Sequence, residues 1–213
     1  IMTAVPRFYQ NLFTKINISF NKQKGIKKLL IYKTILLGKK LLKKEQLKIS
    51  EKLINFVCEK LVRKKIQKQF GGNLQAFISG GGALDKRIGE FLNAIGLPTL
   101  QGYGLTEASP VVSCNLPNLV KVDTVGPAFS TNEVKIADDG EILVKGENVM
   151  LGYWNKEEET NEIIKNGWLH TGDVGELDLN GYLKITDRKK DIIVNLGGDN
   201  IAPSKIENIL CLN

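Results

Sequence analysis

The fold of this chain is decided by the stretch LQAFISGGGAL, residues 74–84. A short apolar run that ends in glycines predicts a buried strand followed by a tight turn. We expect a helix from Asp85 to Ile95, because Gly96 and a proline close behind it would end a helix there. PTLQGYGLTEASPVVS (98–113) then predicts a second strand, a glycine-containing loop and another short element. This order of elements indicates an α/β unit.

A different pattern begins after about residue 130. EVKIADDGEILVKG (133–146) alternates polar and apolar residues around an Asp-Gly pair, which predicts a β-hairpin. GELDLNGYLKITDR (175–188) repeats this design around an Asn-Gly pair, and KDIIVNLGG (190–198) adds a short strand. The sequence therefore predicts a mixed α/β (α+β) fold, in which an α/β domain carries a β-rich subdomain.

The amino-terminal part is helical in pattern and strongly basic. Between Lys15 and Lys68 there are 17 Lys and Arg against 3 Glu, whereas the whole chain carries a net charge of +7. Such a surface attracts anionic partners, either a lipid headgroup layer or an acidic carrier protein. A lysine-rich solvated face explains the same charge, and the apolar residues do not form one clean stripe. Few aromatics are interleaved, so we expect no nucleic-acid partner.

The composition excludes several kinds of site. Hydrophobic residues make up 42% and charged residues 25% of the chain, as in ordinary globular proteins. Cys58, Cys114 and Cys211 are scattered and odd in number, which argues against a disulfide framework or a zinc site. His170 is the only histidine, so a His-based catalytic triad within this chain is excluded.

The ends of the chain suggest a piece of a longer protein. Ile1 precedes Met2, and the chain ends at Asn213 inside an expected helix, Ser204–Leu212. No targeting segment can be read. We expect the cytoplasm or a plastid stroma, with peripheral membrane contact through residues 15–68.

Two motifs in the α/β part suit a nucleotide. SGGGAL (79–84) would let a backbone approach a ligand closely, although it is not a Walker loop and equally suits a plain turn. In QGYGLTEASP (101–110) two glycines bracket Tyr103, which leaves its ring free to lie against a planar ligand. Thr106 and Glu107 offer a hydroxyl and a carboxylate, which suit phosphate and Mg²⁺. A loop capped by these two residues is the alternative.

Two further motifs lie in the β-rich part. In GWLHTGDVGELD (167–178), the Asp173 carboxylate would accept both hydroxyls of a ribose, or would bond its own turn. DRKKDIIVNLGGDNIAPSKIE (187–207) places Arg188, a fixed donor fork for sugar or phosphate oxygens, in what is otherwise an exposed basic turn.

These four blocks, in this order and at these spacings, resemble the AMP-forming acyl-CoA synthetase (adenylate-forming, luciferase-like) superfamily. VPRFYQNLF (5–13) and GENVMLGYWNKEEET (146–160) extend the resemblance over nearly the whole chain. Within the superfamily the blocks look most like long-chain fatty acyl-CoA and acyl–acyl-carrier-protein synthetases.

The resemblance implies a domain plan. Residues 1–189 would form the C-terminal part of the large AMP-binding domain, and residues 190–213 would start the small C-terminal domain. The large-domain part would divide into a basic helical region (1–70), an α/β part (71–130) and a β-hairpin subdomain (131–189). The family's phosphate loop and catalytic lysine would lie before and after this chain, so we expect the chain alone to make no acyl-AMP.

The resemblance also implies roles for individual residues. Thr106 would contact the α-phosphate, Glu107 would hold Mg²⁺, and Lys190 would be the hinge between the domains. The residues around the adenine, with Tyr103 stacked on it, would be Gly80, Gly81, Gly82, Gln101, Gly102, Tyr103 and Gly104. Asp173 and Arg188 would hold the ribose, and Gly197 and Gly198 would border the pantetheine path.

The implied reaction uses ATP, Mg²⁺ and a thiol acceptor. A long-chain fatty carboxylate would attack the α-phosphorus, and coenzyme A would then take the acyl group from acyl-AMP. Three alternatives stay open: an acyl-carrier-protein acceptor, an aryl or short-chain acid substrate, and a non-catalytic nucleotide-binding or interaction remnant.

Overall fold

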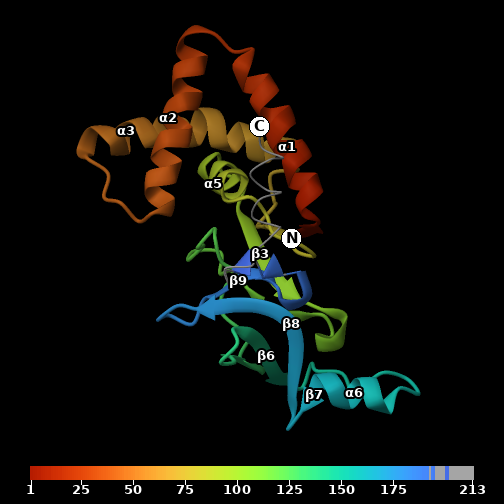
Figure 1. Cartoon of the computed structure of the whole chain (residues 1–213). Helices are drawn as coiled ribbons and strands as arrows, with labels where there is room; N and C mark the ends of the chain where they lie inside the picture. Colours follow the sequence, from red (N-terminus) through yellow and green to blue (C-terminus); the bar gives the residue numbers. More distant parts are fainter. Residues whose placement is uncertain (192, 195–199, 202–213) are drawn as a thin grey trace. The chain divides into compact units, whose positions relative to one another are not determined.

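The computed structural model describes residues 1–191, 193–194 and 200–201 (Figure 1). These residues form two compact units. The first contains Ile1–Gln101 and Pro117–Val122, and the second contains Gly102–Leu116 and the described residues from Asp123 onward. The predicted boundaries at 70, 130 and 189 remain predictions. Within the described part of the chain, no helix is both long and apolar enough to cross a membrane.

The helices of the first unit come from the basic amino-terminal region. They are α1 (Pro6–Asn21), α2 (Gly25–Leu42), α3 (Ile49–Cys58) and α4 (Lys64–Gln69), and a π-helical turn, η1 (Glu59–Arg63), joins the last two. The proline at the first position of α1 suits a helix start, because it lacks an N–H that would have no partner there. The helical pattern predicted for residues 1–70 is confirmed from Pro6 to Gln69, whereas Met2–Ala4 forms a strand.

A parallel sheet lies beside these helices. β1 (Met2–Ala4) pairs with β2 (Phe77–Ser79), which in turn pairs with β3 (Thr99–Gly104). The predicted helix appears between β2 and β3 as α5 (Lys86–Ala94), with the Asp85 side chain accepting a hydrogen bond from the N–H of Arg87. The strand–helix–strand prediction is confirmed, whereas β1 was not anticipated.

The core of the first unit holds one buried arginine. Arg63 is only 5% exposed, and its guanidinium donates to the carbonyls of Ala94 (2.9 Å) and Thr34 (3.2 Å) and to the Asn55 side chain (2.8 Å). Because a buried charge is costly unless it is bonded, these acceptors tie α2, α3 and α5 together.

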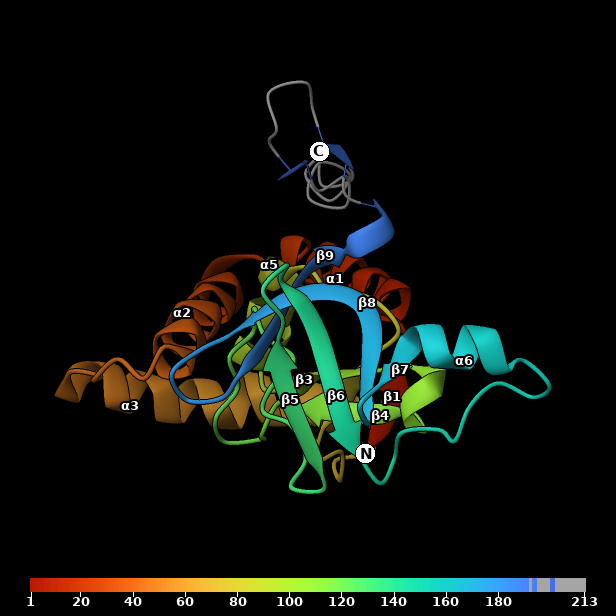
Figure 2. The ribbon, with the colours of Figure 1, turned by 60° about the horizontal axis from the view of Figure 1, so that its bottom comes forward.

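The second unit is built from antiparallel strands. β5 (Asn132–Ile136), β6 (Glu141–Gly146), β8 (Trp168–Leu177) and β7 (Ile164–Lys165) follow in that order, and β9 (Leu183–Arg188) pairs with β8 (Figure 2). Both predicted hairpins, β5–β6 and β8–β9, are confirmed.

The described part of the second unit also contains shorter elements. β4 (Val111–Cys114) pairs antiparallel with the end of β3. β10 (Ile193–Val194), predicted from the sequence, pairs with β11 (Asn200–Ile201). The helix α6 (Glu157–Ile163) was not anticipated, because this acidic segment has no apolar stripe.

Close packing of α2 on α5 leaves no room for a side chain at Gly38. A Cβ there would overlap the backbone of Ala94. We expect Gly38→Ala to lower the free energy of unfolding of the first unit by about 1–3 kcal/mol, because a packed interior resists insertion. Urea unfolding followed by circular dichroism at the helical band measures this. Gly82→Ala is the control, since its Cβ would meet nothing closer than 3.5 Å. Equal stability of the two variants would contradict the prediction.

Candidate active site

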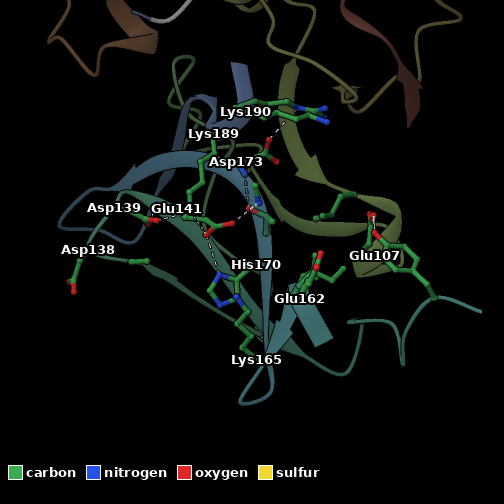
Figure 3. A pocket seen from close by; sticks show the side chains of 18 residues that line it. Glu107, Asp138, Asp139, Glu141, Glu162, Lys165, His170, Asp173, Lys189 and Lys190 are labelled. Carbon is green, nitrogen blue, oxygen red and sulfur yellow. Dashed lines mark hydrogen bonds and ion pairs between the residues drawn. The ribbon is translucent and has the colours of Figure 1, made fainter. Parts of the chain in front are cut away.

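The second unit contains an open cavity of about 1000 Å³. β6, β8 and the end of β9 form much of it, and Leu105 and Glu107 add a wall from the turn after β3 (Figure 3). Its lining is rich in charged groups of both signs. The ionisable side chains are those of Glu107, Asp138, Asp139, Tyr153, Glu141, Glu162, Lys165, His170, Asp173, Arg188, Lys189 and Lys190.

A buried carboxylate lies at one side of the cavity. Asp173 is 8% exposed; its Oδ2 accepts a hydrogen bond from the hydroxyl of Tyr103 (2.7 Å), and its Oδ1 is 3.3 Å from Nε of Arg188. Burial, together with the neighbouring carboxylate, raises the pKa of Tyr103 well above its usual range. The raised pKa favours the protonated hydroxyl, which is the form that donates to Asp173. Tyr103, Asp173 and Arg188, which the sequence analysis found in separate motifs, thus form one interacting group.

The local backbone explains why these three side chains meet. Asp173 and Arg188 are direct partners in the β8–β9 register. Tyr103 lies where the β3–β4 pairing shifts register, next to Gly104, where a Cβ would overlap the carbonyl of Pro110. A glycine is therefore needed beside the tyrosine, so that β4 can close on β3.

Glu107 lies in a separate part of the cavity, on the 3₁₀ turn η2 (Thr106–Ala108). Its carbonyl accepts from the N–H of Met150 (2.8 Å), and its Oε1 accepts from the hydroxyl of Tyr153 (2.7 Å). This hydrogen bond to a carboxylate raises the pKa of Tyr153. Thr106 is exposed on the same turn and is not a lining residue.

The donor set suits a magnesium ion that arrives with phosphates. Within the described residues no cluster of three or more His, Cys, Asp or Glu would hold a metal alone. Mg²⁺ in phosphate sites is commonly held by one or two carboxylates, with phosphate oxygens and water completing the shell. A single Glu107 carboxylate at the cavity wall fits this role. It offers too few ligands for a structural metal site.

A second buried carboxylate, Glu141, braces the same hairpin and was missed from the sequence. Its Oε2 lies 3.0 Å from Nζ of Lys189 and 3.1 Å from Nδ1 of His170, and its Oε1 accepts from the N–H of Gly172 (2.9 Å). Burial opposes ionisation, but the bonds from Lys189, His170 and Gly172 outweigh it and lower the pKa of Glu141. The pKa of Lys189 is raised by its hydrogen bonds to Asp139 and Glu141.

The remaining predicted residues lie elsewhere. Gly80, Gly81 and Gly82 follow β2 in the first unit. The Gln101 side chain is used within that unit, where it accepts from the N–H of Leu84 (3.0 Å) and donates to the carbonyl of Val122. Gly102 is part of β3 in the second unit.

Two predicted positions cannot be compared with the structure. Gly197 and Gly198 fall outside the described residues, as does the expected helix Ser204–Leu212. Lys190, the predicted hinge, lies on an exposed 3₁₀ turn, η3 (Lys189–Asp191), and lines the cavity. The nucleotide and hinge roles of all these residues remain predictions.

Removing the Tyr103 hydroxyl tests the buried network. We expect Tyr103→Phe to lower the free energy of unfolding of the second unit by about 1–3 kcal/mol, since a buried carboxylate loses a donor. Both tryptophans, Trp154 and Trp168, lie in this unit, so their fluorescence in urea reports it. Tyr153→Phe is the matched control, because it breaks an equally short bond (2.7 Å) to an exposed site. A larger loss in the control would be inconsistent with the burial argument.

The pH dependence of stability tests Glu141. Its folded pKa lies below its ordinary value of 4.5, so the unfolded chain takes up the proton at higher pH. The stability that Glu141 contributes is therefore complete above pH 4.5 and is lost as the pH falls through the lower folded pKa. We expect Glu141→Gln to weaken the second unit at pH 7 and to flatten its stability curve in this acid window.

Asp139→Asn is the control for Glu141→Gln, since Asp139 binds the same Lys189 at the surface (2.6 Å). It should cost much less stability at pH 7, because exposed ion pairs contribute little. Unfolding midpoints in urea between pH 3 and pH 7 measure both effects. An unchanged acid slope in Glu141→Gln would contradict the assignment.

Comparison with known proteins extends these observations. A family model described as "AMP-binding enzyme" matches residues 1–154. The long-chain-fatty-acid–CoA ligase FadD15 of Mycobacterium bovis is 46% identical over 154 residues, which are 72% of this chain and 26% of that protein. Long chain acyl-CoA synthetase 3 of Arabidopsis thaliana is 32% identical and matches 98% of this chain and 33% of its own length.

A solved structure agrees with the sequence comparisons. O-succinylbenzoate coenzyme A synthetase (MenE) from Bacillus subtilis, in complex with ATP and magnesium ion, has 36% identity and a TM-score of 0.59 over 63% of this chain and 30% of that one. The chain thus spans about a quarter to a third of the length of the proteins it matches. The predicted mixed α/β, adenylate-forming fold is confirmed, and the chain belongs to the AMP-binding enzyme family of the adenylate-forming superfamily.

Proposed function

We propose that this chain supplies the ribose- and metal-binding part of a fatty acid–CoA ligase that forms AMP. The observation that carries the proposal is the buried Asp173 carboxylate, held by Tyr103 and Arg188 beside a polar cavity. A carboxylate acceptor that is already oriented loses little freedom when ribose hydroxyls donate to it. Arg188 is exposed and would offer further donors to sugar or phosphate oxygens.

The phosphate end of the nucleotide is assigned to the η2 turn. Thr106 would donate its hydroxyl to the α-phosphate, and Glu107 would hold the magnesium ion that accompanies the phosphates. Bound there, Mg²⁺ would neutralise charge on the phosphates. Tyr103 would lie against the adenine through its ring, while Gly80–Gly82 and Gln101 would follow the base.

The proposed chemistry needs no nucleophile from the protein. A carboxylate oxygen of the fatty acid attacks the α-phosphorus, a P–O bond forms, and the bond to pyrophosphate breaks. The thiol of coenzyme A then attacks the acyl carbon, loses its proton, and AMP leaves with the electron pair of the broken C–O bond. Positioning and charge neutralisation by Asp173, Arg188 and Glu107 are the contributions of this chain.

The substrate class rests on the relatives. FadD15 and the Arabidopsis synthetase are named for long-chain acids, which favours a long-chain fatty acid here. MenE is named for succinylbenzoate, so membership of the family alone leaves the acid open. The basic helices at residues 15–68 favour an acidic acyl carrier protein as the second candidate acceptor. The same proposal includes a hinge role for Lys190 and a place for Gly198 beside the pantetheine path. It also includes a cytoplasmic or plastid location.

The test uses the complete product of the gene that carries this sequence. Incubation with Mg·ATP, coenzyme A and palmitate should yield palmitoyl-CoA and AMP in equal amounts, and benzoate and acetate serve as competing acids. Acyl carrier protein replaces coenzyme A in a parallel reaction to identify the acceptor. If none of these acids yields AMP, the chain is a non-catalytic remnant and the proposal fails.

A variant of the same gene product tests the ribose role. Asp173→Asn should raise the KM for ATP about 10- to 100-fold, because each hydrogen bond to a charged group contributes about 1.5–3 kcal/mol. Asp138→Asn is the matched control, since Asp138 lines the same cavity and is exposed. Its KM for ATP should stay within about threefold of the parent, near the scale of surface substitutions. An unchanged KM for ATP in Asp173→Asn would contradict the ribose role of Asp173. It would not contradict the ligase activity itself, which the formation of palmitoyl-CoA and AMP tests.

A further inference from the structure

An exposed apolar stripe runs along α3 and the turn after it. Apart from one adjacent pair, successive members are three or four residues apart, which places them on one side of a helix. They are between 40% and 81% exposed. We call this set the α3 stripe, and it consists of Ile49, Leu53, Phe56, Val57 and Leu61. Figure 1 shows α3 at the margin of the first unit, where it crosses α2.

The opposite side of the same helices faces the protein. Cys58, Val62 and Ile66 are buried there. The acidic residues also turn away from the stripe: Glu51 pairs with Lys40 (2.7 Å), and Glu59 pairs with the buried Arg63 (3.3 Å). Apolar residues thus lie on both sides of these helices, although the outward side of a surface helix is usually covered by polar groups.

Lysines flank the stripe on its exposed side. Lys52 lies four residues before Phe56, and Lys60, Lys64 and Lys68 continue at intervals of four. Nζ of Lys60 lies 4.4 Å from the centroid of the Phe56 ring. All four lysines are exposed, and none forms an ion pair with a residue that the structure describes. The surface is thus apolar along its middle and positive along its length.

This combination identifies the chemistry of a partner. The partner must present an apolar layer directly beside negative charge, because the stripe and its lysines alternate along about 30 Å of helix. The boundary of an anionic lipid bilayer has this order of layers, and long lysine stems reach from the acyl region to the headgroups. An acidic protein would instead need carboxylates at matching positions around a long apolar groove.

We propose that the α3 stripe and its lysines form a peripheral membrane-binding surface for anionic bilayers. The helix would lie in the plane of the membrane, with Leu53, Phe56 and Val57 below the headgroups and Lys52, Lys60 and Lys64 among the phosphates. The proposal concerns attachment only and does not depend on the reaction assigned to the second unit.

The first experiment measures binding to vesicles. The 213-residue chain is sedimented with large unilamellar vesicles of phosphatidylcholine and phosphatidylglycerol at a 7:3 molar ratio, and with vesicles of phosphatidylcholine alone. We expect at least tenfold tighter partitioning to the mixed vesicles, and a fall in binding as NaCl rises from 0.05 to 0.5 M. Absence of binding to the mixed vesicles would overturn the proposal.

Variants locate the surface. Leu53→Ser with Phe56→Ser should lower partitioning at least tenfold, and replacement of Lys52, Lys60, Lys64 and Lys68 by Gln should abolish the preference for the anionic vesicles. Leu151→Ser with Leu179→Ser is the matched control, since both leucines are fully exposed in the second unit. The exposed side chains can be exchanged without loss of core packing, and circular dichroism checks this. Equal binding by the stripe variant and the control would overturn the assignment.

A spectroscopic probe tests insertion directly. Tryptophan emission of Phe56→Trp should shift to the blue on mixed vesicles and be quenched by lipids brominated on the acyl chain, beyond the response of the parent chain. Lack of added quenching would place the stripe outside the bilayer and overturn the proposal. A dimer that forms through the stripe in sedimentation without vesicles would also overturn the proposal. So would vesicle binding by the 213-residue chain but not by the complete gene product, because another part of the polypeptide would then cover the stripe.

Discussion

The candidate site depends on the burial of one carboxylate. Asp173 is shielded from water, so its charge is stable only if donors inside the protein replace the lost hydration. The hydroxyl of Tyr103 and the guanidinium of Arg188 are those donors. To bring them together, the end of β3 must lie against β4, and β8 and β9 must pair in one register. A ligand that binds beside Asp173 therefore meets a group that the sheet has already oriented.

Glu141, at the start of β6, supports the same arrangement. It holds the backbone N–H of Gly172, which immediately precedes Asp173, and the ammonium of Lys189, which immediately follows Arg188. The two buried carboxylates thus fix both strands of one hairpin at neighbouring positions. Networks of this kind are stable only when every member is bonded, and this requirement gives the site a single geometry. Arg188 and Lys190 are exposed, so they are accessible to a ligand.

The first unit uses its buried polar groups differently. Arg63 donates hydrogen bonds to Ala94, Thr34 and Asn55, so the interior of the helical region is joined by hydrogen bonds as well as by apolar contact. α3 contributes Asn55 to this interior network, while the large apolar residues of the α3 stripe stay exposed on its other side.

The sequence by itself determined the elements and the candidate residues. Turn pairs such as Asp139-Gly140 and the glycines after β2 act within a few positions of the chain, so local chemistry was enough to predict the hairpins and the strand–helix–strand order. Only the tertiary structure decided which side chains meet, since Tyr103 and Asp173 are 70 positions apart and Glu141 and Lys189 are 48 apart. It also decided which side of α3 faces water, because a periodic apolar pattern gives the side of a helix but not the surroundings of that side.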